Sequence, residues 1–146
     1  MIASWFISIV LIHSVVSIPF RDCGAQVGDV YLLTVSGCDE APCALHKGKN
    51  STITMEFVSF DTVESGKISV HAVFALVSIP FPLSNSNLCD FVSPACPLVP
   101  SVDKYTYTYT LPVHESYPSV SFKMRWELKD SFNDDIFCVE FPVQII

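Results

Sequence analysis

Hydrophobic and polar residues alternate along much of the chain, most plainly in the run KYTYTYTLPV at residues 104–113. Successive side chains of an extended strand point to opposite faces. Tyr105, Tyr107 and Tyr109 are therefore expected on one face, and the threonines between them on the other. Tyrosine suits a face that is apolar along its length and polar at its tip, which describes either a core layer or the wall of a cavity. The pattern predicts a strand and leaves that choice open.

Five other stretches also have the pattern of a strand. Residues 121–129 alternate most strictly, with Phe122, Met124, Trp126 and Leu128 on the face expected to be buried. The six predicted strands are residues 30–35, 52–57, 67–77, 104–113, 121–129 and 136–146. Turn-forming clusters separate them, and no stretch has a convincing helical period. The pattern predicts one compact all-β domain built as a two-sheet sandwich.

The first residues of the chain form a separate hydrophobic segment. Residues 2–16 are apolar without a charged side chain, and Val15 and Ser17 have the spacing of a signal-peptidase site. A transmembrane anchor is the alternative, but the run is shorter than the roughly 20 residues that span a bilayer. We expect a signal peptide at residues 1–17 and a mature, soluble domain at residues 18–146.

All six cysteines follow the expected cleavage site, and an even number in a secreted chain indicates three disulfides. From the residues alone, many pairings are open. A zinc site is the alternative, but the close pairs are separated by four and six residues rather than by the two of most zinc knuckles. We therefore expect no metal. The tripeptide NST makes Asn50 a predicted N-glycosylation site.

Charge and motifs argue against two large classes of function. The net charge is −7 and the eight basic residues are scattered, so no basic stripe is present that would bind nucleic acid. The four histidines are isolated from one another, and no nucleophile elbow, zinc-protease helix or phosphate-binding glycine loop occurs. We expect a protein that is not an enzyme and uses no cofactor. The apolar content, 50% of residues, leaves room for a lipid ligand beside a core.

Short motifs in a fixed order carry a family resemblance. They are DCG at 22–24, PC at 42–43, IPFP at 79–82, CPL at 96–98, LPV at 111–113, YPS at 117–119 and CVEFPVQI at 138–145. Together they resemble the ML lipid-recognition domain family, and within it the soluble Niemann–Pick type C sterol-transfer proteins of the epididymal secretory type. Mite group-two allergens belong to the same superfamily. The resemblance covers residues 21–146.

The resemblance implies an immunoglobulin-like sandwich of about seven strands with a lipid cavity between the sheets. It also implies the disulfides Cys23–Cys138, Cys38–Cys43 and Cys89–Cys96. Motif by motif, it implies that Phe81, Val113, Tyr117 and Pro118 form the mouth and wall of the cavity. Inner-face positions expected to line it are Val35, Leu45, Tyr107, Trp126, Val139 and Phe141. The mammalian members that the chain most resembles have tryptophan where Val139 stands, and isoleucine is usual where Phe141 stands, so the shape of the cavity is expected to differ.

Three functions are compatible with these observations. The first is a monomeric carrier that binds a sterol or another apolar lipid and transfers it through transient contact with a membrane or a membrane-bound acceptor. The second is an innate-immune protein that recognises microbial lipid, which usually requires cationic residues at the cavity rim. The third is an adhesion module with a filled core. The resemblance favours the carrier, secreted or resident in the endosome–lysosome lumen.

Overall fold

The structure is a computed structural model that describes residue 3, residues 5–11 and residues 16–146. Val15 and six other residues of the expected signal peptide lie outside the described residues, and the signal peptide stays a prediction. Among the described residues, no helix has the length and apolar character needed to cross a bilayer.

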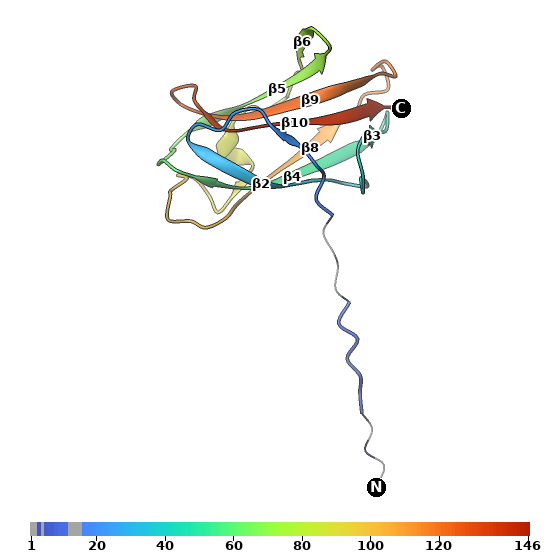
Figure 1. Cartoon of the computed structure of the whole chain (residues 1–146), viewed down its shortest axis with the longest axis vertical. Coiled ribbons are helices and arrows are strands. Elements are labelled where there is room, and N and C mark those ends of the chain that lie inside the picture. Colours follow the sequence, from blue (N-terminus) through green and yellow to red (C-terminus); the bar gives the residue numbers. More distant parts are fainter. Residues whose placement is uncertain (1–2, 4, 12–15) are drawn as a thin grey trace.

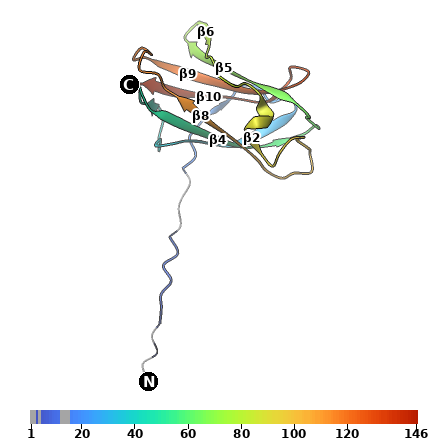
Figure 2. The same ribbon diagram turned by 180° about the vertical axis from the view of Figure 1, so that it is seen from behind.

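Two antiparallel sheets pack face to face (Figures 1 and 2). The described strands are β1 (Arg21–Asp22), β2 (Gly28–Val35), β3 (Cys43–Leu45), β4 (Asn50–Ser59), β5 (Gly66–Phe74), β6 (Val77–Pro80), β7 (Val92–Ser93), β8 (Tyr105–Pro112), β9 (Ser121–Asp130) and β10 (Asp135–Ile145). A short 3₁₀ turn, η1 (Leu88–Asp90), precedes β7. The six-stranded sheet has the order β1-β10-β9-β5-β6, with β3 added in parallel to the end of β10. The four-stranded sheet has the order β2-β4-β8-β7.

The all-β sandwich is confirmed, and seven of these strands, namely β2, β4, β5, β6, β8, β9 and β10, have four or more residues. One predicted strand was wrong. The stretch 67–77 divides into β5 and β6, which form a hairpin around a turn at Ala75 and Leu76. This turn contains no glycine, proline or asparagine, and its residues continue the apolar run, so the local pattern carries no sign of it. The structure exposes Leu76 fully, at the tip of the hairpin.

The core lies between the two sheets and follows the alternation in the sequence. In β8, Tyr105, Tyr107 and Tyr109 point inward while the threonines between them lie outside. In β9, Phe122, Met124, Trp126 and Leu128 are buried in the same way. Facing rows of large side chains from β8 and β9 therefore fill the centre of the sandwich, as the period of two requires.

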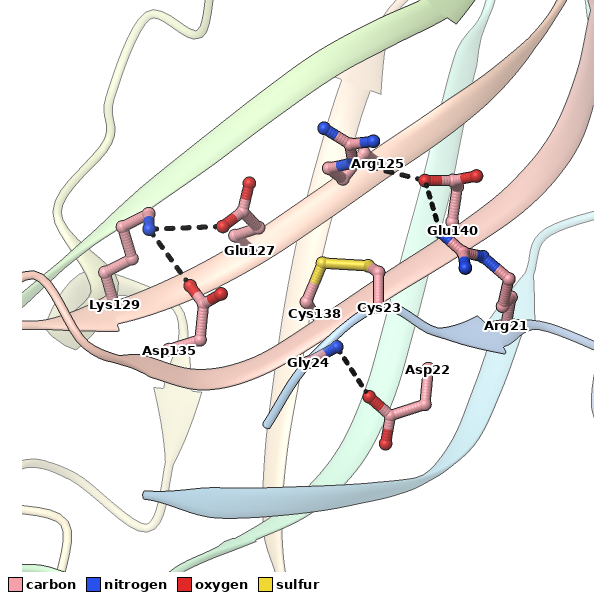
Figure 3. Close-up of a disulfide and its surroundings, with 10 residues drawn as sticks. All are labelled: Arg21, Asp22, Cys23, Gly24, Arg125, Glu127, Lys129, Asp135, Cys138 and Glu140. Carbon is pink, nitrogen blue, oxygen red and sulfur yellow. Dashed lines mark hydrogen bonds and ion pairs between the residues drawn. A yellow bond between two sulfur atoms is a disulfide. The ribbon is translucent and has the colours of Figure 1, made fainter. Parts of the chain in front are cut away.

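Three disulfides join Cys23 to Cys138, Cys38 to Cys43 and Cys89 to Cys96, which are the pairs that the resemblance implies. The first spans 115 positions of the sequence. It connects the end of β1 to the middle of β10 (Figure 3). The other two close short loops, separated by 5 and 7 positions.

Two groups of charged residues flank the long-range disulfide on the outer face of the six-stranded sheet (Figure 3). In one, the buried carboxylate of Glu140 pairs with Arg125, 3.1 Å away, and with Arg21, 3.6 Å away. In the other, the ammonium of Lys129 lies 3.1 Å from carboxylate oxygens of both Glu127 and Asp135. These pairs tie β1, β9 and β10 together across their outer side.

Asp135 is expected to make the stability of the domain depend on pH. Burial raises the pKa of its carboxyl to about 6, the Glu127 carboxylate adds to the rise, and Lys129 opposes it. Because the ordinary value is 3.8, the folded protein binds a proton more strongly than the unfolded chain between these two values. The free energy of unfolding should therefore increase as the pH is lowered from about 7 to about 5, and Asp135→Asn should remove that increase.

Urea unfolding of the parent and of Asp135→Asn at the two pH values measures this difference. Asp134→Asn removes the neighbouring carboxylate and is the matched control, which should keep the parent's pH dependence. If Asp135→Asn gains as much stability at the lower pH as the parent does, Asp135 is not the responsible group.

Candidate lipid-binding site

Aromatic side chains meet at the open edge of the sandwich, where the segment after β6 faces the end of β8. The ring of Phe81 contacts the ring of Tyr117 edge-on, with centroids 5.7 Å apart. The ring of His114 also meets Tyr117 edge-on, with centroids 5.1 Å apart. The backbone N–H of Phe81 donates to the carbonyl of Val70 in β5, which holds this residue against the sheet. Phe81 and Tyr117 are partly buried, so they form a rim rather than a core layer.

A small pocket of about 70 Å³ opens beside this rim. Leu83, Tyr109, Leu111, His114 and Tyr117 contribute to its lining. Pockets that enclose a drug-sized ligand have volumes of roughly 300 Å³ or more. A lipid could therefore enter here only if the lining side chains moved apart.

Behind the pocket, an aromatic cluster continues into the centre of the sandwich. Tyr109 lies 4.7 Å from Phe91 and 5.6 Å from Trp126, measured between ring centroids. Tyr107 stacks beside Tyr109 and meets Trp126 edge-on at 6.1 Å. These four rings, which we call the aromatic cluster, come from β8, β9 and the segment between η1 and β7, and they link the two sheets.

The hydroxyl groups of the three β8 tyrosines have different partners. The hydroxyl of Tyr105 accepts a hydrogen bond from the backbone N–H of Val99 and donates to the carbonyl of Pro97. The hydroxyl of Tyr107 accepts a bond of 3.1 Å from the indole N–H of Trp126, and burial raises its pKa well above the ordinary value. For Tyr109, no hydrogen bond joins its hydroxyl to any residue that the structure describes. Tyr105 is thus a structural residue, whereas the other two retain unused hydrogen-bonding capacity.

The predicted lining residues occupy three places. Phe81 and Tyr117 form the rim, and Pro118, next to Tyr117, is exposed. Tyr107 and Trp126 belong to the aromatic cluster, and Val139 is paired with Trp126 across β9 and β10. The remaining predicted residues are buried farther along the inner faces, where Phe141 pairs with Met124, Val35 with Ile53 and Leu45 with Ile145. Their contact with a ligand stays a prediction.

Val113 differs from the rim residues. Only 3% of it is exposed, and its backbone exchanges hydrogen bonds with the segment before β4, accepting from Gly48 and donating to Lys49. A charged side chain at this position would be buried without a partner. Val113 therefore belongs to the closed wall of the sandwich.

Several residues that line the pocket were missing from the predicted set, notably Leu83, Tyr109, Leu111 and His114. The alternation had already placed Tyr109 and Leu111 on the same face as Tyr107 and Val113, so that signal was sufficient to find them. Leu83 and His114 lie in connecting segments, where no periodic pattern indicates the direction of a side chain.

A larger hollow elsewhere has a different character. A groove of about 780 Å³ lies against the six-stranded sheet and is bordered by Lys123, Glu140 and Pro142. None of the predicted lipid-binding residues borders it. Elsewhere on the same sheet, the side chains of Glu127, Asp135 and Cys138 come close together, but Cys138 is bonded to Cys23 and Lys129 pairs with both carboxylates. These three residues therefore do not offer a metal site.

Substituting tryptophan for Val139 should overpack the interior, because this side chain is fully buried beside Trp126. We expect Val139→Trp to lower the free energy of unfolding by about 1–3 kcal/mol. Thermal unfolding and lipid selectivity are measured on the same purified variant. Val77→Trp, on the exposed strand β6, controls for the indole itself and should unfold like the parent. Parent-like stability with altered selectivity in Val139→Trp would instead indicate that Val139 borders the ligand.

Comparison with known proteins gives a consistent result. The family model described as the ML domain matches residues 17–145. The chain is 38% identical over 129 residues to NPC intracellular cholesterol transporter 2 of Danio rerio, covering 88% of this chain and 85% of the relative. It is 36% identical over 131 residues to NPC intracellular cholesterol transporter 2 homolog a of Drosophila melanogaster, covering 88% of each. The crystal structure of a Niemann-Pick type C2 protein from Japanese carpenter ant superposes with a TM-score of 0.80 at 29% identity, covering 88% of this chain and 99% of that one.

Proposed function

The chain belongs to the ML domain family, and from this premise we propose that it is a non-enzymatic carrier that binds a sterol between its two sheets and transfers it. The observation that carries the proposal is the small pocket beside the aromatic rim. Its lining includes Pro82, Leu83 and Tyr109, and Tyr109 is also a member of the aromatic cluster between the sheets. The zebrafish and fly relatives are both named as cholesterol transporters, which supports the same ligand class.

The physical basis of binding is removal of apolar surface from water. Burial contributes about 25 cal/mol per Å², so enclosing several hundred Å² of a sterol offers on the order of 10 kcal/mol before the costs of association. Part of this free energy must separate side chains that are packed together in the ligand-free protein. Phe81 and Tyr117 are suited to move first, because each is partly exposed and they contact each other only edge-on.

Release requires that the rim meet a membrane or an acceptor protein. The β5–β6 hairpin, which directly precedes Phe81, exposes Leu76, Val77 and Ile79. Exposed apolar side chains beside a ligand entrance favour contact with another apolar surface. We include this hairpin in the proposed contact region.

The surroundings of the rim support recognition of microbial phospholipid or glycolipid less than they support binding of a sterol. Of the lysines, Lys47 donates to the hydroxyl of Ser119, Lys104 pairs with Glu56, and Lys123 lies on the outer face of the other sheet. None of these lysines lines the pocket, although Lys47 reaches Ser119, two positions from the rim residue Tyr117. The names of the relatives do not favour this alternative.

Entry into the secretory pathway remains part of the proposal. The packed domain begins at Ile18, which is buried and whose N–H donates to the carbonyl of Leu33. Three disulfides support an oxidising compartment, extracellular or endolysosomal. Asn50 is exposed at the start of β4, as a glycosylation site must be.

Direct binding tests the carrier function. The secreted protein is stripped of lipid, incubated with labelled cholesterol over a range of concentrations, and separated from free sterol. We expect saturable binding with one site per chain, and transfer of the bound sterol to acceptor vesicles. If cholesterol does not bind saturably while a phospholipid or glycolipid does, the sterol assignment is wrong.

A further inference from the structure

The asparagine of the NST tripeptide stands on a defined face of the sandwich. Asn50 begins β4 and is exposed, whereas alternate residues of the strand, such as Ser51 and Ile53, are buried. Because side chains of a strand alternate between its faces, Asn50 shares the outer face of the four-stranded sheet with Thr52 and Thr54. No described residue forms a hydrogen bond with the side-chain amide of Asn50. The nitrogen to which a glycan would be joined is therefore free on that outer face.

The outer face next to Asn50 consists largely of threonine. On β8, Thr110 lies opposite Thr52, and their hydroxyl oxygens are 3.3 Å apart. On β2, Thr34 lies opposite Thr54. Each threonine presents a methyl group and a hydroxyl that both donates and accepts hydrogen bonds. A sugar ring, with hydroxyls at its edge and C–H groups on its two faces, is chemically complementary to such a surface.

This face is also hollowed beside the same row of side chains. A pocket of about 290 Å³ is lined by the side chains of Thr34, Thr52 and Thr54 together with the turn after β2, and only Asp39 among its lining residues is charged. Successive residues on one face of a strand are about 7 Å apart, so the pocket begins within reach of the first sugars on Asn50. Its volume is close to the lower limit of about 300 Å³ for ligand pockets. Val16 borders it as well, and the expected cleavage after Ser17 would remove Val16 and open the pocket further.

From these positions we propose that Asn50 carries an N-linked glycan whose inner sugars lie along the outer face of the four-stranded sheet and occupy this pocket. The other direction open to the glycan is across the rim, since Asn50 pairs with Pro112, which borders the rim pocket. The sheet itself separates the two routes. Tyr109 and Leu111, which line the rim pocket, are buried on the inner face of β8. The glycan thus leaves the rim and the β5–β6 hairpin uncovered for exchange of the ligand.

The proposal rests on entry into the secretory pathway and not on the identity of the lipid. Its test uses the secreted protein expressed with high-mannose glycans. Intact mass before and after complete deglycosylation should show one glycan on the parent and none on Asn50→Gln. Thermal unfolding then compares the intact parent with the parent trimmed by an endoglycosidase to a single sugar. We expect the intact form to melt about 2–4 °C higher, because trimming removes sugars that pack beside Thr54. Sterol transfer to vesicles should be equal in the two forms.

Two variants distinguish packing in the pocket from the mere presence of a glycan. Thr54→Lys fills the pocket with a long side chain and keeps the NST tripeptide, so its intact and trimmed forms should melt together. The second variant combines Asn50→Gln with Phe60→Asn, which moves the glycosylation site to the β4–β5 turn because Thr62 follows two positions later. Phe60 is 57% exposed and lies at the opposite end of β4 from the pocket. Its glycan should not change the melting temperature when trimmed.

Several results would overturn the proposal. They are a secreted parent without a glycan, equal melting of its intact and trimmed forms, and a difference between these forms that persists in Thr54→Lys. Faster sterol transfer by the trimmed parent would place the glycan over the rim and would overturn it too. Retention of the protein in the cytosol would refute entry into the secretory pathway, and the glycan with it. Failure to bind any sterol would refute the carrier function alone, since occupancy and melting temperature are measured without a ligand.

Discussion

Replacing Cys23 and Cys138 together with alanine is expected to lower the free energy of unfolding by about 4–5 kcal/mol, the value that the chain-entropy model assigns to a loop of this length. The bond joins residues 115 positions apart, so its loss releases nearly the whole domain in the unfolded state. In the folded state it also secures β1, which pairs with β10 through only two residues. Most small domains have a total stability not far above this loss, so secretion should fall sharply.

Urea unfolding of purified protein and the amount secreted by the expressing cells measure the two effects. The matched control is the double alanine variant of Cys89 and Cys96, whose bond spans 7 positions and for which the same model gives about 2 kcal/mol. We expect the order parent, short-loop variant, long-loop variant in decreasing stability. Equal losses in the two variants would show that loop length does not determine the contribution of these bonds.

Phe81→Asp is expected to reduce sterol transfer at least about tenfold while the domain stays folded, a loss equivalent to roughly 1.4 kcal/mol or more. The ring of Phe81 lies against Tyr117 at the rim, partly in contact with water. A carboxylate there can stay hydrated as long as the pocket is closed. Once a sterol passes the rim, the charge would lose water to an apolar ligand, which opposes both entry and release.

Transfer of labelled sterol between vesicles, together with a thermal unfolding curve, tests this expectation. Phe132→Asp is the matched control, because it makes the same exchange at a phenylalanine that is 84% exposed in the β9–β10 turn. The control should transfer sterol like the parent. Normal transfer by Phe81→Asp would mean that the entrance lies elsewhere.

The orientation of side chains was predictable wherever a strand alternates. The period of two is a property of the extended backbone itself, so β8 and β9 could be assigned an inner face from residues 104–113 and 121–129 alone. The same reasoning failed at residues 67–77. An unbroken apolar run has no period that would indicate its facing. The turn at Ala75 and Leu76 depends on the pairing of β6 with the edge of β5, which the local sequence does not specify.

The disulfide pairing illustrates a second limit. Six cysteines indicated three bonds, but the choice of partners came from family resemblance, because the spacing of cysteines in the chain does not determine which sulfurs meet. The same holds for the ion pairs around the long-range bond. Arg21, Arg125 and Glu140 come together only because β1, β10 and β9 lie side by side.

By itself, the sequence determined that this is a disulfide-bonded all-β domain, which face of each regular strand is buried, and that three tyrosines share one of those faces. Only the tertiary structure decided what each tyrosine does. The hydroxyl of Tyr105 is satisfied by the segment before β8, that of Tyr107 by an indole from the opposite sheet, and that of Tyr109 by none of the described residues. The reason is physical: alternation is set by neighbouring residues along one backbone, whereas a hydrogen-bond partner is set by whichever distant group the packing of the two sheets brings within about 3 Å.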